Sequence, residues 1–324
     1  MQKCPLCVIA GPTASGKTAL SIELAKQLNG EIISADSMQI YKGMDIATAK
    51  PTLQERAQVP HHLIDFLDVS ESYSVARYVE DARACIKEIW NRGKIPFLVG
   101  GTGLYINAVI DHLSFPEIKQ SPQLRSQLQQ QAKEQGGAAL LEQLRSFDPE
   151  TASRLHENNL GRIIRAIEVY RLTGIPMQEH QKRSRQESSP YNLCYLGLNF
   201  QNRAHLYERI NLRVDQMMKQ GLLEECQTAM EKGLSGTAVQ AIGYKELFPY
   251  LCGQTSLSQC VDRLKQVTRQ YAKRQLTWFR REPRIFWLLL DEMSGDEAIA
   301  TALSQISFHG LLGDSDGKGI SSKQ

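Results

Sequence analysis

The sequence predicts an α/β protein with a P-loop core, in which a parallel sheet is flanked by helices, plus an inserted all-helical subdomain. Three observations support this fold class. A glycine-rich turn, Gly11–Thr18, joins a short apolar segment to a helical one. Strand and helix patterns then alternate through the first third of the chain, as in βαβ units. After Phe115-Pro116 the pattern becomes purely helical.

The alternating elements can be placed in chain order. Short apolar runs predict strands, and longer amphipathic segments predict helices. The expected strands are Cys7–Ala10, Glu31–Ser34, Leu63–Phe66 and Phe97–Val99, and the expected helices are Thr18–Leu28 and Val75–Arg92. Binding groups in parallel sheets gather beyond the carboxyl ends of the strands. Gly11, Asp36 and Gly100 all fall there, so we expect the functional site at that edge.

A helical subdomain is expected over residues 117–190. It contains three helical segments, which are Ser121–Gln135, Ala138–Ser146 and Leu160–Leu172. Gly174 and Pro176 follow the third segment, and these residue types commonly end helices. Because strand patterns lie on both sides of this stretch, we expect residues 1–116 and 191–306 to form one catalytic core around the insertion.

The second part of the core mixes strands and helices. Leu193–Asn199 predicts a strand, helices are expected between Arg203 and Phe279, and Ile285–Leu290 predicts a last edge strand. The chain beyond Gly310 is rich in Gly, Ser and Asp. Such segments cannot bury enough apolar surface to fold, so residues 307–324 are expected to form a disordered tail.

Composition narrows the class of protein. The chain has 324 residues, of which 42% are hydrophobic and 23% charged, enough for one large or two modest cores. No apolar run approaches the ~18 residues that a membrane span needs, and the first residues lead directly into the glycine-rich turn rather than into a signal peptide. Seven cysteines without repeated spacing argue against a zinc ribbon and fit a reducing compartment. We therefore expect a cytoplasmic protein that does not enter a membrane.

The glycine-rich turn matches the phosphate-binding pattern G-x-x-x-x-G-K-[ST] between a strand and a helix. Backbone N–H groups in this arrangement cradle phosphate oxygens, Lys17 adds a positive charge, and the Thr18 hydroxyl can ligate Mg²⁺. A glycine turn without a ligand is the alternative. The expected diphosphate-binding residues are Gly11, Pro12, Thr13, Ala14, Ser15, Gly16, Lys17 and Thr18.

The loop alone leaves kinases, NTPases and diphosphate-consuming transferases open. Motor ATPases and GTPases place a metal-binding Asp at the end of an apolar strand, whereas Phe97–Val99 is followed by Gly100-Gly101-Thr102-Gly103. An N-K-x-D guanine motif and an Arg-rich lid are also absent from the sequence. These absences favour chemistry other than NTP hydrolysis. A P-loop kinase of a small metabolite and a non-catalytic RNA-binding protein remain as alternatives.

Several segments together resemble the tRNA dimethylallyltransferase family. They occur in family order over roughly residues 7–290, and as a set they are highly specific. Beyond the phosphate loop they are Asp36–Tyr41, Lys42–Pro51, Gly100–Tyr105, Arg162–Glu168, Ala241–Lys245 and Lys273–Arg280. One departure is His156-Glu157-Asn158-Asn159, where the family commonly has His-Pro-Asn-Asp.

The resemblance implies transfer of a dimethylallyl group from dimethylallyl diphosphate to N6 of the adenine 3′ of the anticodon, with Mg²⁺. The sequence has no D-D-x-x-D metal motif, so the phosphate loop must stabilise the leaving pyrophosphate. Asp36 is the candidate base for the adenine amine, Thr102 can hydrogen-bond the same region, and Lys17 completes the expected catalytic set. A helix N-cap is the alternative reading of Asp36.

The resemblance also implies contacts with the tRNA anticodon stem-loop by a monomeric enzyme. Arg269–Arg284 holds six Lys/Arg and one acid, which suits RNA phosphates but also an ordinary solvated helix face. Arg213 is expected either at the donor diphosphate or in a surface salt bridge. The expected tRNA contacts are Asp36, Ser37, Met38, Gln39, Thr102, Arg125, Gly161, Arg162, Ile163, Ile164, Arg165, Gln240, Ala241, Ile242, Gly243, Tyr244, Lys245, Lys273, Arg274, Gln275, Leu276, Thr277, Trp278, Phe279 and Arg280.

Overall fold

A computed structural model of the chain describes residues 3–115, 121–184, 188–234 and 237–311. The chain divides into two compact units. Unit 1 comprises Met1–Ile110 with Pro190–Gln324, and unit 2 comprises Asp111–Ser189. The sequence-based boundaries at 116/117 and 190/191 therefore lie within a few residues of the two places where the chain passes between units.

Unit 1 is built on a six-stranded sheet in the order β3-β2-β4-β1-β5-β6, with every neighbouring pair parallel. The strands are β1 Cys4–Ala10, β2 Gly30–Ser34, β3 His61–His62, β4 Ile95–Gly100, β5 Tyr191–Asn199 and β6 Phe286–Leu289. This confirms the predicted parallel sheet and its last edge strand. Because β2, β4 and β1 are adjacent, the residues that follow their carboxyl ends are brought side by side.

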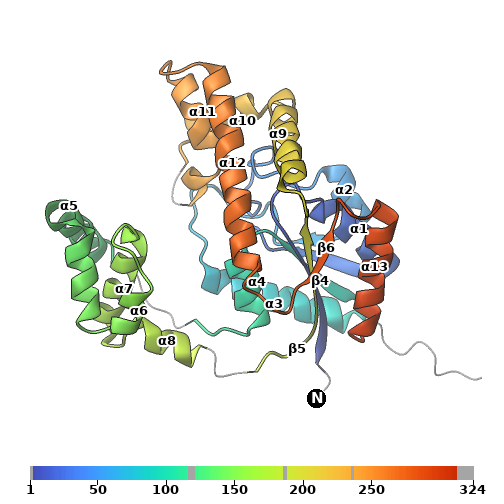
Figure 1. The fold of residues 1–324 in the computed structure, drawn as a ribbon, viewed down its shortest axis with the longest axis horizontal. Coiled ribbons are helices and arrows are strands. Elements are labelled where there is room, and N and C mark those ends of the chain that lie inside the picture. Colours follow the sequence, from blue (N-terminus) through green and yellow to red (C-terminus); the bar gives the residue numbers. More distant parts are fainter. Residues whose placement is uncertain (1–2, 116–120, 185–187, 235–236, 312–324) are drawn as a thin grey trace, which may run out of the picture. The chain divides into compact units, whose positions relative to one another are not determined.

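Helices cover both faces of the sheet, as Figure 1 shows. Helices α1 (Lys17–Gln27) and α13 (Gly295–Phe308) pack on one face, where Leu24, Phe97 and Ile306 share a buried core with the strands. Helices α3 (Val75–Asn91) and α4 (Gly103–Ile110) pack on the other face. The short α2 (Leu53–Gln58) precedes β3. The four central strands, β2, β4, β1 and β5, are largely buried because both faces are covered, which explains their apolar runs.

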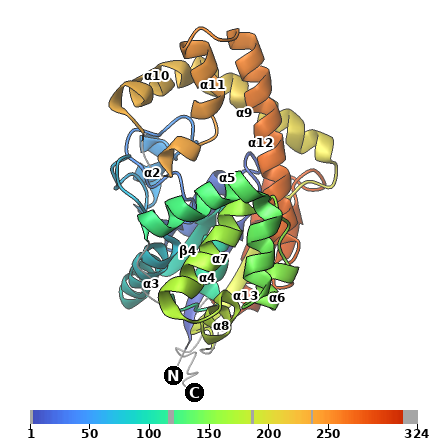
Figure 2. The ribbon, with the colours of Figure 1, turned by 90° about the vertical axis from the view of Figure 1, so that its left-hand side faces the viewer.

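A helical layer stands at the carboxyl edge of the sheet. It consists of α9 Arg203–Lys219, α10 Leu222–Lys232, the 3₁₀ turn Ala238–Gln240, α11 Tyr244–Leu251 and α12 Leu257–Phe279. These helices pack on one another and lie together at one end of the unit in Figure 2. The Ser256 hydroxyl caps α12 by accepting from the Gln259 N–H, and this cap fixes where the long helix begins.

Unit 2 is entirely helical in its described residues. It contains α5 Pro122–Arg145, α6 Pro149–Ser153, α7 Leu160–Thr173 and α8 Met177–Arg183 around a core that includes Leu128, Leu144 and Ile167. Gly136 breaks the helical geometry inside α5 with φ 82° and ψ 167°, which fits the two segments expected from the sequence. The departure at His156–Asn159 leaves a closed turn, in which the Asn159 carboxamide oxygen accepts from the His156 N–H at 3.1 Å.

Two expectations about the core were wrong. Leu63–Phe66 is not a strand, because Leu63 and Asp65 adopt left-handed φ values of 55° and 59° that interrupt an extended backbone. The tail does not begin at residue 307, because α13 continues to Phe308 and Leu311 is buried in the core. The remainder of the expected tail, 312–324, lies outside the described residues.

Candidate active site

The phosphate loop is held from two sides by helices of the α9–α12 layer. Gly16 adopts φ 93°, a left-handed value that favours glycine, and begins α1 without a side-chain cap, so the first N–H groups of α1 point into the loop. The Gln275 carboxamide oxygen accepts from the Thr13 N–H at 2.8 Å. Arg209 donates through Nε to the Ala14 carbonyl at 3.0 Å. The loop is therefore a preorganised anion cradle.

Lys17 is the main cation of this cradle. Its Nζ donates to the carbonyls of Gly11 at 3.0 Å and Pro12 at 2.7 Å. The pKa of Lys17 is lowered to about 7, mainly by burial and also by the Arg213 charge, while the Asp36 carboxylate opposes the fall. A second negative charge at this position, such as a diphosphate, would favour the protonated form.

Proton uptake on diphosphate binding follows from this arrangement. With a pKa of about 7, Lys17 is mostly neutral at pH 8 and mostly charged at pH 6. Binding of an anion should raise that pKa, so the protein should take up close to one proton at pH 8 and little at pH 6. Titration calorimetry of pyrophosphate in buffers of different ionisation enthalpy measures this number. The difference should disappear in Lys17→Ala, and an equal uptake in both proteins would contradict the assignment.

Asp36 follows β2 and lies in the same pocket as Lys17. Its Oδ1 accepts from the backbone N–H groups of Met38 at 2.9 Å and Gln39 at 3.4 Å. The backbone after Asp36 forms a turn and not a helix, so Asp36 is not a helix N-cap, although one carboxylate oxygen holds this turn. Burial raises the pKa of Asp36, while these N–H groups and the charges of Lys17 and Arg213 oppose the rise. A carboxylate with a raised pKa is a stronger base than an ordinary surface Asp.

Thr102 connects the turns that follow β2 and β4. Its Oγ1 accepts from the Ser37 N–H at 3.1 Å, and its own N–H donates to the Ala35 carbonyl at 3.1 Å. The neighbouring Gly101 has no side chain, which leaves room for Gln275 of α12. A Cβ at this position would lie 2.2 Å from the Gln275 Nε2. That Nε2 donates to the Gly101 carbonyl at 3.0 Å. The glycine-rich segment is therefore required for α12 to approach both turns.

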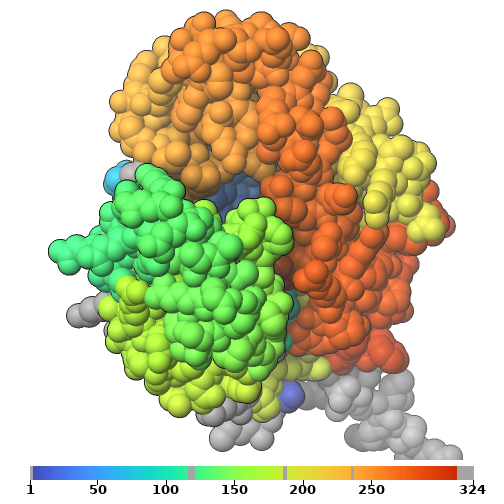
Figure 3. All heavy atoms as spheres, turned by 60° about the vertical axis from the view of Figure 1, so that its left-hand side comes forward, coloured from blue at the N-terminus to red at the C-terminus, as the bar shows by residue number. Residues whose placement is uncertain are grey.

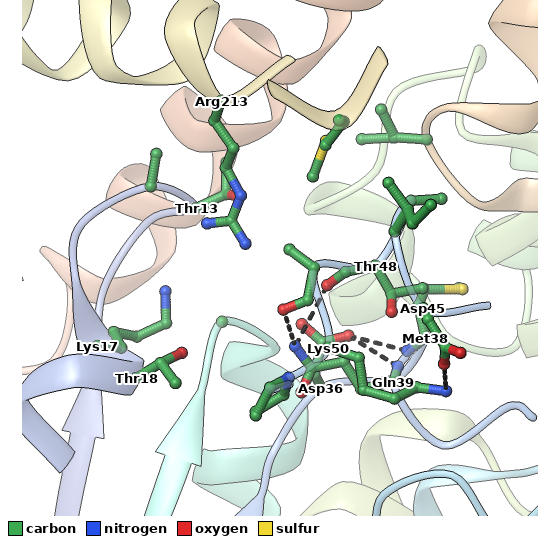
Figure 4. A pocket seen from close by; sticks show the side chains of 18 of the residues that line it. Thr13, Lys17, Thr18, Asp36, Met38, Gln39, Asp45, Thr48, Lys50 and Arg213 are labelled. Atoms are coloured by element: carbon green, nitrogen blue, oxygen red, sulfur yellow. Dashed lines mark hydrogen bonds and ion pairs between the residues drawn. The ribbon is translucent and has the colours of Figure 1, made fainter. Parts of the chain in front are cut away.

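Residues 13–18 of the phosphate loop, Asp36, Gly101 and Gln275 line one cavity of about 1010 Å³, all of whose lining residues belong to unit 1. Thr102 is not among the residues that line it and acts on the site through the Ser37 N–H. In Figure 3, blue atoms from the N-terminal part of the chain lie at the bottom of a hollow beneath the orange helices. Figure 4 shows Lys17 and Thr18 on the phosphate loop, Asp36 on the turn after β2, and Arg213 projecting from α9 toward the space between them. Arg213 is thus at the pocket, and the alternative of a surface salt bridge is not what the structure shows.

Another wall of the pocket is a loop within Lys42–Pro51, a segment that carries the family resemblance but for which the motifs predicted no role. The Glu225 carboxylate of α10 accepts from three consecutive backbone N–H groups, those of Asp45 at 2.9 Å, Ile46 at 2.8 Å and Ala47 at 3.0 Å. Lys50, which is buried, closes the other end through an ion pair with Asp65 at 2.7 Å. Glu225 lies 178 to 180 residues from these partners, so no local pattern could have indicated its role.

The expected RNA-contact residues of unit 1 divide into two groups. Lys245 on α11 and Lys273, Arg274, Thr277, Trp278 and Arg280 on α12 are exposed. The side chains of Ala241, Tyr244, Gln275, Leu276 and Phe279 are buried. Tyr244 donates to Glu225 at 2.9 Å, and the Gln39 carboxamide donates to the carbonyls of Thr48 and Ala49. Packing and internal hydrogen bonds already engage these side chains, and their contact with RNA stays a prediction.

Unit 2 presents its expected RNA contacts around a buried acid. Glu168 accepts from Arg125 at 2.8 Å and from Arg165 at 2.9 Å. Burial opposes ionisation of Glu168, but the hydrogen bonds from both guanidinium groups keep its pKa below the ordinary value. Gly161 and Arg162 are exposed, whereas Ile163 and Ile164 are buried in the core of the unit. The expected RNA contact at Ile163 and Ile164 stays a prediction, and it would have to be made by their backbone rather than by their buried side chains.

The pocket fits a magnesium ion that arrives with a diphosphate. Within the described residues there is no group of three or more His, Cys, Asp or Glu that could hold a metal by itself. Mg²⁺ commonly uses one or two protein oxygens, with phosphate oxygens and waters as the remaining ligands. The Thr18 hydroxyl and the Asp36 carboxylate lie in the same pocket and are suitable ligands of this kind.

Comparison with known proteins agrees with the geometry. A family model described as IPP transferase matches residues 39–282, and one described as isopentenyl transferase matches residues 4–70. The tRNA dimethylallyltransferase of Carboxydothermus hydrogenoformans is 52% identical over 283 residues, which cover 87% of this chain and 91% of the relative. This chain belongs to the tRNA dimethylallyltransferase family. The resemblance inferred from the sequence motifs is confirmed.

Solved structures of the family share the fold. The tRNA isopentenylpyrophosphate transferase from Bacillus halodurans matches with a TM-score of 0.71 and 45% identity, covering 96% of this chain and 99% of that one. A eukaryotic dimethylallyltransferase acting on tRNA matches with a TM-score of 0.77 and 31% identity, covering 94% and 80% respectively. These matches confirm the P-loop-type α/β core. In the described part of the chain, none of the helices has the length and apolar character of a membrane span.

Proposed function

We propose that this family member transfers the dimethylallyl group of dimethylallyl diphosphate to N6 of the adenine that lies 3′ of the anticodon in tRNA. The observation that carries the proposal is the convergence of an anion cradle and a separate carboxylate in one pocket. Lys17 belongs to the cradle that follows β1, whereas Asp36 follows β2, which β4 separates from β1. A passive RNA-binding surface does not need this pairing. A kinase can use the same pairing for phosphoryl transfer, and membership of the tRNA dimethylallyltransferase family argues against that alternative.

The phosphate loop supports departure of pyrophosphate. Negative charge increases on the leaving oxygen as the bond from carbon to oxygen breaks, so donors that are already oriented lower the barrier. The N–H groups at the start of α1, Lys17 and Arg213 all face this part of the pocket. When bound with the diphosphate at Thr18, Mg²⁺ would neutralise further charge on the phosphate oxygens.

Asp36 supports attack by the adenine amine. This amine is a poor nucleophile because its lone pair is delocalised into the ring, and it must lose a proton as the new bond forms. Asp36 keeps one oxygen on the Met38 and Gln39 N–H groups, which fixes the carboxylate plane and directs the other oxygen to the amine. Thr102 holds the adjacent turn through Ser37. The adenine must leave the anticodon-loop stack to reach this position.

A labelling experiment distinguishes the proposal from its alternatives. Purified protein is incubated with bulk tRNA and either dimethylallyl diphosphate labelled in the prenyl group or ATP labelled in the γ-phosphate. Transfer of the prenyl label to tRNA supports the proposal. Transfer of the phosphate label to a small molecule would favour the P-loop kinase, and transfer of neither label would favour a non-catalytic RNA-binding protein.

The exposed cations of α12 are proposed to bind RNA phosphates. Lys273→Ala and Arg280→Ala should each weaken tRNA binding and make the slope of log K against log salt shallower. Each phosphate contact that is lost should reduce the slope by up to about 0.9 in a duplex, and by less in a single strand, because fewer counterions are released on binding. Fluorescence titrations over a range of salt concentrations measure the slope. Lys87→Ala on α3 removes an equally exposed charge outside this segment and is the control. Unchanged slopes in both α12 variants would return α12 to an ordinary solvated face.

We further propose that the protein works as a monomer in the cytoplasm. All seven cysteines are free, as expected in a reducing compartment. Light scattering of the purified protein with and without tRNA tests the monomer. A stable dimer whose activity falls on dilution would contradict it.

A further inference from the structure

The proposed reaction imposes a requirement that the phosphate loop and Asp36 do not meet. When the C1–O bond of the donor breaks, pyrophosphate takes the electron pair and positive charge spreads over the allyl group. The adenine N6 lone pair then forms the new bond to C1, and its proton passes to Asp36. The carbon centre therefore needs a neighbour that stabilises a cation without reacting with it. An aromatic ring face has this property.

One aromatic ring lies where this requirement arises. Tyr271 of α12 is the only Phe, Tyr or Trp among the described residues that line the pocket. Tyr271 lies one turn of α12 before Gln275. Gln275 in turn holds the phosphate loop through the Thr13 N–H, and Thr102 holds the turn that carries Asp36 through the Ser37 N–H.

The helix that carries Tyr271 contacts the elements that hold both reacting partners. The leaving group belongs to the phosphate loop and the attacking amine to Asp36, so the carbon that is transferred must lie between those two elements. Tyr271 lines the same pocket as Lys17 and Asp36. One turn further along α12, the Gln275 carboxamide bonds the Thr13 N–H of the phosphate loop and the Gly101 carbonyl of the turn after β4, so α12 holds the ring at a fixed place in this pocket.

We propose that the Tyr271 ring is a catalytic group that stabilises the positive charge of the dimethylallyl moiety while the C1–O bond breaks. This role rests on the proposed prenyl transfer and adds to it a specific carbon-facing group. The ring has a second cation nearby, because the Arg274 guanidinium carbon lies 5.7 Å from the ring centroid. The competing explanation is that the Tyr271 ring holds Arg274 in place for RNA binding. An experiment must distinguish this role from stabilisation of the allyl cation.

Substitutions that separate ring, hydroxyl and electron density test the role. Tyr271→Phe keeps the ring and should retain the single-turnover rate within about three-fold, whereas Tyr271→Leu should lower it about ten- to thirty-fold, the size of a desolvated cation contact. Phe analogues with one, two and three ring fluorines at position 271 should lower the logarithm of the rate in even steps. Donor and tRNA affinities should stay constant. Tyr250→Leu, on the exposed side of α11, is the control for loss of an aromatic ring.

Three outcomes would overturn the proposal. If Tyr271→Leu transfers as fast as Tyr271→Phe, the ring has no part in the chemical step. If Tyr271→Phe is as slow as Tyr271→Leu, the hydroxyl is needed to position Gln275 and Thr102, and the ring face is not. If fluorination changes tRNA affinity while the single-turnover rate stays unchanged, the ring positions Arg274 for RNA binding and has no part in the chemical step. Failure of prenyl transfer in the unaltered protein would instead refute the function itself.

Discussion

Asp36→Asn should lower the single-turnover rate of prenyl transfer by roughly 10²–10⁴-fold, which is the usual contribution of a general base. Asn has the same size and can still accept from the Met38 N–H through its carboxamide oxygen, as Asp36 does at 2.9 Å. It cannot accept the amine proton near neutral pH. The turn should therefore remain folded while the chemical step slows. Single-turnover kinetics with saturating donor and tRNA measure that step separately from binding.

The control for this variant is Asp262→Asn, which removes the same charge from an exposed position on α12. Its rate and both affinities should match those of the unaltered protein. The free energy of unfolding of Asp36→Asn should stay within about 1 kcal/mol of the original value, since a polar residue at a strand end supports little core. A near-normal rate for Asp36→Asn would falsify the assignment. A slow rate together with lost tRNA binding would make Asp36 a recognition residue.

The fold could be predicted where sequence patterns report burial directly. A strand ending at Ala10 and a helix starting at Thr18 were expected, because a strand covered on two faces is uniformly apolar and the P-loop pattern fixes the turn between them. The strand ends at Ala10 and the helix begins one residue earlier than expected, at Lys17. Leu63–Phe66 carries the same apolar signal. It is held as a loop by long-range bonds, such as those from the Phe66 and Leu67 N–H groups to the Ile40 carbonyl, and no local pattern encodes these.

The candidate site was predictable only in its parts that follow strands. Lys17, Asp36 and Thr102 follow β1, β2 and β4, whose carboxyl ends lie at the same edge of the sheet. The expected parallel topology predicted this arrangement, because binding groups gather at that edge. The residues that hold these groups in place were not predictable, because Gln275 lies 262 residues from its partner Thr13. Motif resemblance also overstated direct contacts. Along a helix, consecutive motif residues alternate between solvent and core, so Phe279 is buried beside the exposed Arg280.

Lys17→Ala should have the other large effect, a fall in turnover of roughly 10²–10³-fold, the range seen when a preorganised oxyanion donor is removed. The Lys17 Nζ already lies within 3.0 Å of the Gly11 and Pro12 carbonyls, so no movement of the loop is needed to present its charge to a diphosphate. Donor affinity should also decrease. The pKa of Lys17 is about 7 without a ligand, and a bound diphosphate favours the protonated form, so the wild-type residue adds an ion pair that Ala cannot make. Steady-state kinetics and calorimetry measure the two effects.

The same variant should bind tRNA within about two-fold of the original affinity, since RNA phosphates are held by exposed cations that Lys17 does not touch. Lys26→Ala provides the matched control, because Lys26 lies on the same helix, carries the same charge and is exposed to solvent. It should leave turnover, donor affinity and tRNA affinity unchanged. A parallel collapse of tRNA affinity and turnover in Lys17→Ala, with Lys26→Ala normal, would show that the phosphate loop binds the RNA as well as the donor. The proposed separation of donor and acceptor sites would then be wrong.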